Sequence, residues 1–154
     1  MEDNSNSRTD PRSLARFLAI QYLFTKLQED KSRVGYNVFE PNALLSIMEE
    51  KKYSGKLYEE LIDGVEENEK KLDEIIQRFA PAWPLDQINP VDLIVLRVAV
   101  FEGFISKLTP VKVVINEAVD LSKALSSEKS GKFVNGVLGA ILNNEKLPDG
   151  PESK

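Results

Sequence analysis

Proline residues divide this chain into helical segments, and that division constrains the fold more than any other feature. Proline fits the first turn of a helix and breaks a helix interior. The prolines that matter are Pro11 after Asp10, Pro41, the pair Pro81 and Pro84, Pro90 after Asn89, and Pro110. Between them apolar residues recur at helical spacing, with no strand-like alternation of useful length. The sequence therefore predicts an all-α fold.

Six helices are expected, in two groups of three separated by residues 80–90. The first begins at Pro11, with Tyr22 among its core candidates, a short second one opens at Pro41, and the third covers 56–79. The fourth starts at Pro90, the fifth covers 110–125, and the sixth is capped by Ser126 or Ser127 and ends near 142. We expect a single domain over 9–145, with helical halves at about 9–80 and 88–145 and flexible tails at 1–8 and 146–154.

The composition argues against catalysis. The chain has no cysteine and no histidine, so it lacks disulfides, thiolate ligands and the commonest general base near neutral pH. Acidic clusters between Glu59 and Glu74 alternate with Lys70 and Lys71, which is typical of a solvated helix face. No phosphate loop or metal-ligand spacing occurs. We expect no enzyme, no metal and no cofactor. The chain shows neither a signal peptide nor a membrane span, so we expect a cytoplasmic protein with no membrane partner.

Acidic charge is concentrated in the middle of the chain. The net charge is −5, but residues 1–39 and 93–154 each have a balance of +1, whereas residues 40–92 have −7. Phosphate contact needs lysine and arginine. The two ends could supply one basic patch if the fold brings them together, so the sequence permits RNA binding without requiring it.

Three segments carry a family resemblance: Leu96–Glu102, Pro110–Val119 and Lys132–Leu138, which reads Lys-Phe-Val-Asn-Gly-Val-Leu. With the weaker pattern of Leu57, Leu61, Gly64, Val65 and Asn68, the chain resembles the NusB family over nearly its whole length. The resemblance implies a NusB-like pair of three-helix bundles. It also implies an RNA-binding transcription antitermination factor that recognises single-stranded boxA RNA in nascent ribosomal leaders. The implied partners are a small-subunit ribosomal protein acting as NusE and the RNA polymerase elongation complex, and some family members form homodimers.

The resemblance also selects candidate RNA-binding residues. The arginines would bind phosphates, the aromatic rings would stack on bases, and the residues at the start of the sixth helix would contact sugar or phosphate oxygens. The candidates are Arg8, Arg12, Arg16, Phe24, Asp92, Lys129, Ser130, Lys132 and Phe133. From the residues alone, the arginines would be interpreted as ordinary surface residues and the aromatics as core residues. Residues 127–132 would be interpreted as a capped helix start. The basic N-terminal segment is thinner here than is usual in the family, which predicts weak RNA binding without a partner.

Other motif residues are expected to be structural. Asn116, Glu117 and Asn135 are predicted to bridge helices through buried hydrogen bonds, and Gly136 to mark a close helix crossing. Arg97 and Glu102 are expected to pair. The alternative function is an acidic helical interaction module, possibly homodimeric, in which RNA binding is weak and the central third binds a basic partner.

Overall fold

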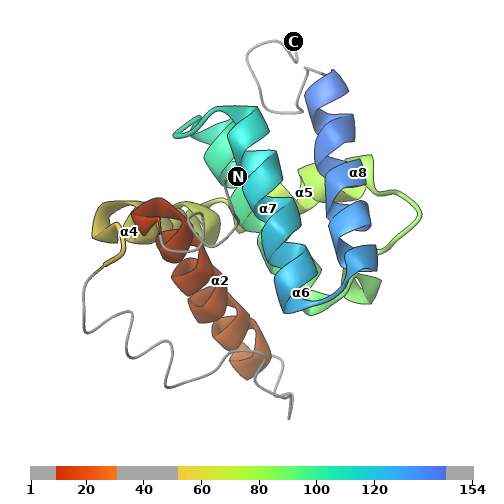
Figure 1. The fold of residues 1–154 in the computed structure, drawn as a ribbon. Helices are drawn as coiled ribbons and strands as arrows, with labels where there is room; N and C mark the ends of the chain where they lie inside the picture. Colours follow the sequence, from red (N-terminus) through yellow and green to blue (C-terminus); the bar gives the residue numbers. More distant parts are fainter. Residues whose placement is uncertain (1–9, 31–51, 145–154) are drawn as a thin grey trace. The chain divides into compact units, whose positions relative to one another are not determined.

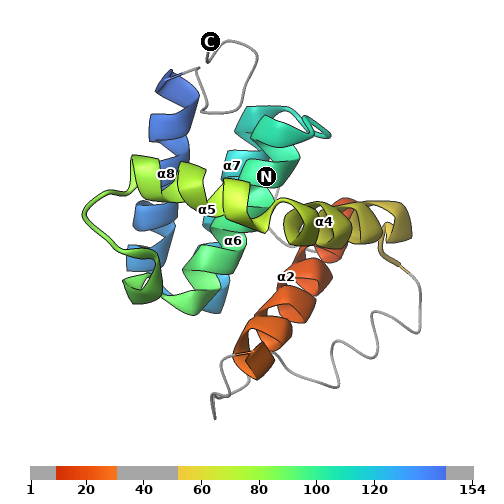
Figure 2. The same ribbon diagram turned by 180° about the vertical axis from the view of Figure 1, so that it is seen from behind.

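The computed structural model of the chain describes residues 10–30 and 52–144 (Figures 1 and 2). Within these ranges every regular element is a helix, and the predicted all-α fold class is confirmed. The chain forms two compact units that divide between Asp63 and Gly64. Arg8, the two tails and the second helix predicted at Pro41 lie outside the described residues.

The first unit contains α2 (Pro11–Asp30) and most of α4 (Gly55–Glu67). The predicted helix start at Pro11 is confirmed, and Asp10 caps α2, because its Oδ2 accepts hydrogen bonds from the backbone N–H groups of Arg12 (3.1 Å) and Ser13 (3.2 Å). Ser54 caps α4, and its own N–H donates to the carbonyl of Pro11 (2.9 Å). The prediction that Tyr22 is a core residue is wrong, since its side chain is 37% exposed.

The predicted third helix is two helices, α4 and α5 (Glu69–Phe79). Asn68 separates them, with φ −116° and ψ 17°. Its side-chain amide donates to the carbonyl of Gly64 (2.7 Å), and such local side-chain bonds compete with helical continuation. Gly64 itself faces the ring of Phe101 so closely that a methyl group there would overlap the ring. The interruption at Asn68 therefore follows, within four residues, a close contact between α4 and the ring of Phe101.

The second unit is built around α6 (Pro90–Val100). Helices α5, α7 (Val111–Leu125) and α8 (Glu128–Asn144) all pack against α6 (Figures 1 and 2). All ten residues from Val91 to Val100 are buried, because α6 has neighbours on every side. The predicted start at Asn89 and Pro90 is confirmed, as Asn89 Oδ1 accepts from the N–H of Val91 (2.8 Å). A short 3-10 turn, η1 (Leu85–Gln87), precedes α6, and a π-helical turn, η2 (Phe101–Ile105), follows it.

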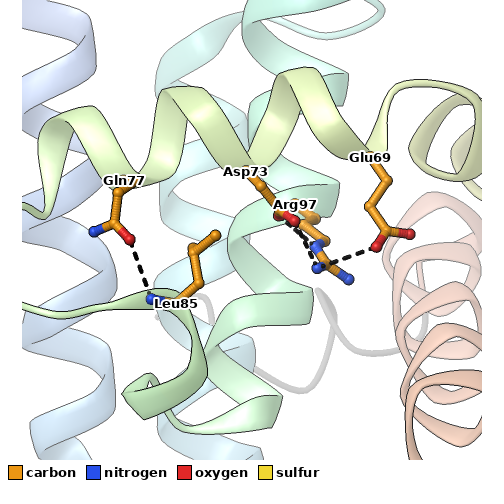
Figure 3. Close-up of polar contacts among 5 residues, drawn as sticks. All are labelled: Glu69, Asp73, Gln77, Leu85 and Arg97. Carbon is orange, nitrogen blue, oxygen red and sulfur yellow. Dashed lines mark hydrogen bonds and ion pairs between the residues drawn. The ribbon is translucent and has the colours of Figure 1, made fainter. Parts of the chain in front are cut away.

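Two buried charges inside this unit have partners other than those predicted. Arg97 makes a two-pronged contact with Asp73, with Nε to Oδ1 at 2.8 Å and Nη2 to Oδ2 at 3.0 Å, and lies 3.4 Å from Glu69 (Figure 3). Glu102 is fully buried and accepts a 2.6 Å hydrogen bond from the hydroxyl of Thr109. The predicted Arg97–Glu102 pair is therefore wrong, because α5 supplies the carboxylates for Arg97.

The predictions of buried bridges by Asn116 and Asn135 and of a close helix crossing at Gly136 are also wrong. Asn116 and Asn135 are exposed, and Gly136 has nothing within 4 Å of the position that a Cβ would take. Helical periodicity explains this, because the apolar residues beside them face inward and leave these three on the outer faces of α7 and α8. Glu117 is half-buried. The close approach of α7 and α8 lies at Gly131, where a Cβ would stand 2.6 Å from the Lys123 side chain.

Candidate nucleic-acid interface

The start of α8 is held by a cluster of hydroxyl groups and one carboxylate. Ser127 Oγ accepts from the N–H of Ser130 (3.1 Å) and caps the helix, as predicted. The Ser130 hydroxyl donates to Asp92 Oδ2 on α6 (3.0 Å) and shares a 2.8 Å hydrogen bond with the Ser126 hydroxyl. Together with the close approach at Gly131, these bonds tie the first turn of α8 to α6 and α7.

Asp92 is an unusually situated carboxylate, since only 4% of it is exposed. Burial raises the pKa of Asp92 above its ordinary value, and the hydrogen bond from Ser130 lowers it in part. Its second oxygen, Oδ1, is buried with no hydrogen-bond partner among residues 10–30 and 52–144. Asp92 and Ser130, both predicted to contact RNA, are buried, and their hydrogen bond supports the start of α8.

The basic and aromatic side chains of the same helix start face outward. Lys129 and Lys132 are exposed, and Phe133 is half-buried. Lys129 lies three and four residues from Lys132 and Phe133, so all three share one face of α8. Positive charge and an aromatic edge on a fixed surface can contact phosphate and base together. We define the surface of Lys129, Lys132 and Phe133 as the α8-start surface.

Trp83 extends the α8-start surface. Its ring lies edge-on to the ring of Phe133, with centroids 6.3 Å apart and planes at 78°. Trp83 is 50% exposed, although it is a large hydrophobic residue. Sequence reasoning treated the segment 81–84 only as a helix break and missed this residue. The signal that could have found it is a tryptophan between two prolines, in a short segment that offers no helical face on which to bury it.

The candidates on α2 belong to the first unit and are less accessible. Arg12 is exposed in the first turn, whereas Arg16 and Phe24 are each only 4% exposed. Arg16 shares a helix face with Ala19, Ile20 and Leu23, all of which are buried. This burial argues against direct phosphate contact by Arg16 and against stacking by Phe24. The basic arm at Arg8 lies outside the described residues.

The described parts of the chain offer neither a metal site nor a membrane span. Residues 10–30 and 52–144 contain no group of three carboxylates that could hold a metal ion. None of the helices in these ranges is long and apolar enough to cross a membrane.

The sequence matches a known family over most of its length. Residues 13–143 fit the family model described as NusB. The chain belongs to the NusB family. This range includes α2 from Ser13 onward, α4 and the α8-start surface, whereas the candidates Arg8 and Arg12 precede it.

Individual NusB proteins match different shares of the chain. It is 39% identical over 133 residues to the transcription antitermination protein NusB of Bacillus licheniformis, covering 86% of this chain and 97% of that protein. The match to NusB of Chloroflexus aggregans is 46% identical over 91 residues, but it covers only 58% of this chain and 61% of that protein. A chain in the crystal structure of the antitermination factors NusB and NusE in complex with double-stranded RNA is 28% identical. Its TM-score is 0.64, with 86% of this chain and 96% of that chain covered.

Proposed function

We propose that this protein is a cytoplasmic transcription antitermination factor that binds RNA together with the ribosomal protein NusE. The observation that carries the proposal is the NusB family match over 13–143, supported by relatives named as antitermination proteins. The similar structure containing NusB, NusE and RNA supports the choice of partners. The complex would act on the RNA polymerase elongation complex, as a binding factor rather than a catalyst.

The α8-start surface supports an RNA role in this chain. Its two lysines are exposed and its backbone is fixed by the Ser127 cap and the Asp92–Ser130 hydrogen bond. A rigid basic surface loses little freedom when phosphate binds, which favours affinity. Arg12 in the first turn of α2, and Arg8 before it in the sequence, would add phosphate contacts in this proposal.

The preferred RNA in this proposal is a single strand of boxA type. Unpaired bases expose the edges and faces that proteins read, whereas an A-form duplex hides them in a narrow groove. An aromatic ring such as Phe133 adds affinity only where a base face is free to stack. The related structure contains double-stranded RNA, so a test must include both forms of RNA.

A specific observation favours a second candidate, an acidic interaction module. Glu59, Glu66, Glu67 and Glu74 are all exposed on α4 and α5. They could bind a basic protein partner without RNA, and the module could form a homodimer. Charge of this kind is also usual on a solvated helix face.

The proposal is tested by filter binding with three RNAs: a boxA-like single strand, a scrambled strand and a boxA-like duplex. Each is measured with and without the ribosomal partner. We expect weak binding by the protein alone and a selective gain for the boxA-like strand when the partner is present. Equal gains for all three RNAs would contradict sequence recognition. Binding of the ribosomal partner without binding of any of the three RNAs would favour the acidic interaction module.

A further inference from the structure

An exposed tryptophan held in a fixed loop is the feature of this molecule that its described packing does not explain. Trp83 keeps half of its surface exposed, and its ring lies edge-on to that of Phe133. Exposed tryptophan surface is unfavourable in water, at about 25 cal/mol for each Å² of apolar area. An exposed tryptophan ring on a fixed loop is expected where that ring binds another molecule.

The side chain of Gln77 fixes the backbone of the loop that carries Trp83. Gln77 of α5 donates from Nε2 to the carbonyls of Ala80 (3.2 Å) and Trp83 (2.9 Å), and its Oε1 accepts from the N–H of Leu85 (3.1 Å). Figure 3 shows Gln77 on α5 above Leu85. These three bonds bind the backbone on both sides of Trp83. The ring is thus presented without being covered.

The charge beside Trp83 indicates an anionic occupant. Phe133 touches Trp83, Lys132 precedes it in α8, and Lys129 lies one turn earlier on the same face. An aromatic face beside two exposed lysines suits a base next to its own phosphates, with stacking from the ring and charge from the lysines. A purely apolar protein segment would use the ring but gain nothing from the lysines.

We infer that Trp83 is a base-stacking residue for single-stranded RNA, placed by Gln77 and Phe133 at the edge of the α8-start surface. The inference rests on the proposed RNA-binding function and adds to it a residue and a contact. It requires an unpaired base, because a base inside a duplex has no free face.

Trp83 is the only tryptophan in the chain, so its fluorescence reports this site alone. Titration of the full chain with a boxA-like single strand should change the emission, and a duplex of the same sequence should change it much less. Trp83→Ala should weaken single-strand binding about 5- to 160-fold, the range that corresponds to the loss of about 1–3 kcal/mol given by alanine substitution for base–aromatic stacking. Trp83→Phe should keep most of the affinity, and Gln77→Ala should reduce it with the ring still present.

Leu108→Ala is the matched control, because Leu108 is another exposed large hydrophobic residue in the same unit and should leave RNA binding unchanged. An abasic scan of the RNA makes the contact specific. One abasic position should weaken binding to the native chain but have no additional effect on Trp83→Ala, since both changes remove the same stack.

Other outcomes would contradict the inference in distinguishable ways. Native RNA affinity in Trp83→Ala with unchanged emission in the native chain would overturn the role of Trp83 and leave the proposed function standing. If Trp83→Ala weakens binding of the ribosomal partner and leaves RNA binding unchanged, Trp83 belongs to a protein interface, and the inference is overturned as well. No RNA binding by the native chain in any arm would overturn both.

Discussion

Gly64 and Gly136 both belong to family motifs, but their surroundings predict opposite effects of adding a methyl group. At Gly64 the methyl would overlap the buried ring of Phe101, so Gly64→Ala should lower the free energy of unfolding by about 1–3 kcal/mol. At Gly136 nothing lies within 4 Å, so Gly136→Ala should raise it by about 0.5–1 kcal/mol through better helix propensity. Urea unfolding followed by circular dichroism measures both. Equal effects would mean that packing at Gly64 is looser than described.

The burial of Asp92 predicts that the stability of the protein depends on pH. Its raised pKa means that the folded state holds the proton more tightly than the unfolded chain does. The resulting destabilisation is absent below the ordinary pKa of 3.8, grows as pH rises from there through the folded-state pKa, and is complete above it. Asp92→Asn cannot ionise, so it should be more stable than the native chain at neutral pH, with the difference shrinking toward acid.

The measurement for Asp92 is the melting temperature of both proteins across pH 3 to 8. Ser130→Ala provides a check, because removing the donor to Asp92 should raise the pKa of that carboxyl further. A difference between the native chain and Asp92→Asn that stays constant across this range would show that Asp92 does not titrate as burial requires.

At the scale of elements, the buried Arg97 joins α5 to α6. Asp73→Ala removes both short contacts to the guanidinium and should destabilise the protein by about 1–3 kcal/mol, because a buried charge loses its main partner. Glu74→Ala is the matched control, since Glu74 is the next residue and is exposed. It should change stability by less than about 0.5 kcal/mol. Similar losses from both variants in urea unfolding would place the Arg97 contact among weak surface pairs.

Helix starts could be predicted from the sequence because capping is local. Asp10, Asn89 and Ser127 each bond an N–H within three residues. The break at Asn68 was missed because apolar residues keep helical spacing on both sides of it, although the side chain of Asn68 bonds locally to the carbonyl of Gly64. The partners of Arg97 were missed because they depend on how α5 crosses α6 (Figure 3).

The candidate site also has features that the local sequence predicts and features that depend on packing. Residue types suited to RNA could be picked out at the start of α8, but periodicity does not say which of them face solvent. Asp92 and Ser130 are buried where α6 packs against α8, and their hydrogen bond holds the helix start. Trp83 was missed because its exposure depends on the bonds that Gln77 makes to its loop.

For the whole molecule, the central claim is that an overall acidic protein binds RNA through local basic surfaces. The α8-start surface is basic on a chain of net charge −5. A nonspecific field would respond to total charge wherever it changes, whereas phosphate contact responds to position. Two double variants with equal charge change separate these possibilities.

The most direct measurement compares RNA binding by Lys129→Glu with Lys132→Glu and by Lys70→Glu with Lys112→Glu, in the presence of the ribosomal partner. All four lysines are exposed, and Lys129 and Lys70 are each the second residue of a helix after a glutamate. Each double variant moves the net charge from −5 to −9, because each substitution changes it by −2. We predict that the Lys129/Lys132 double variant loses more than about tenfold in affinity and has a shallower salt dependence, while the Lys70/Lys112 variant stays within about threefold of the native chain. Equal losses from two variants with matching melting temperatures would contradict the account.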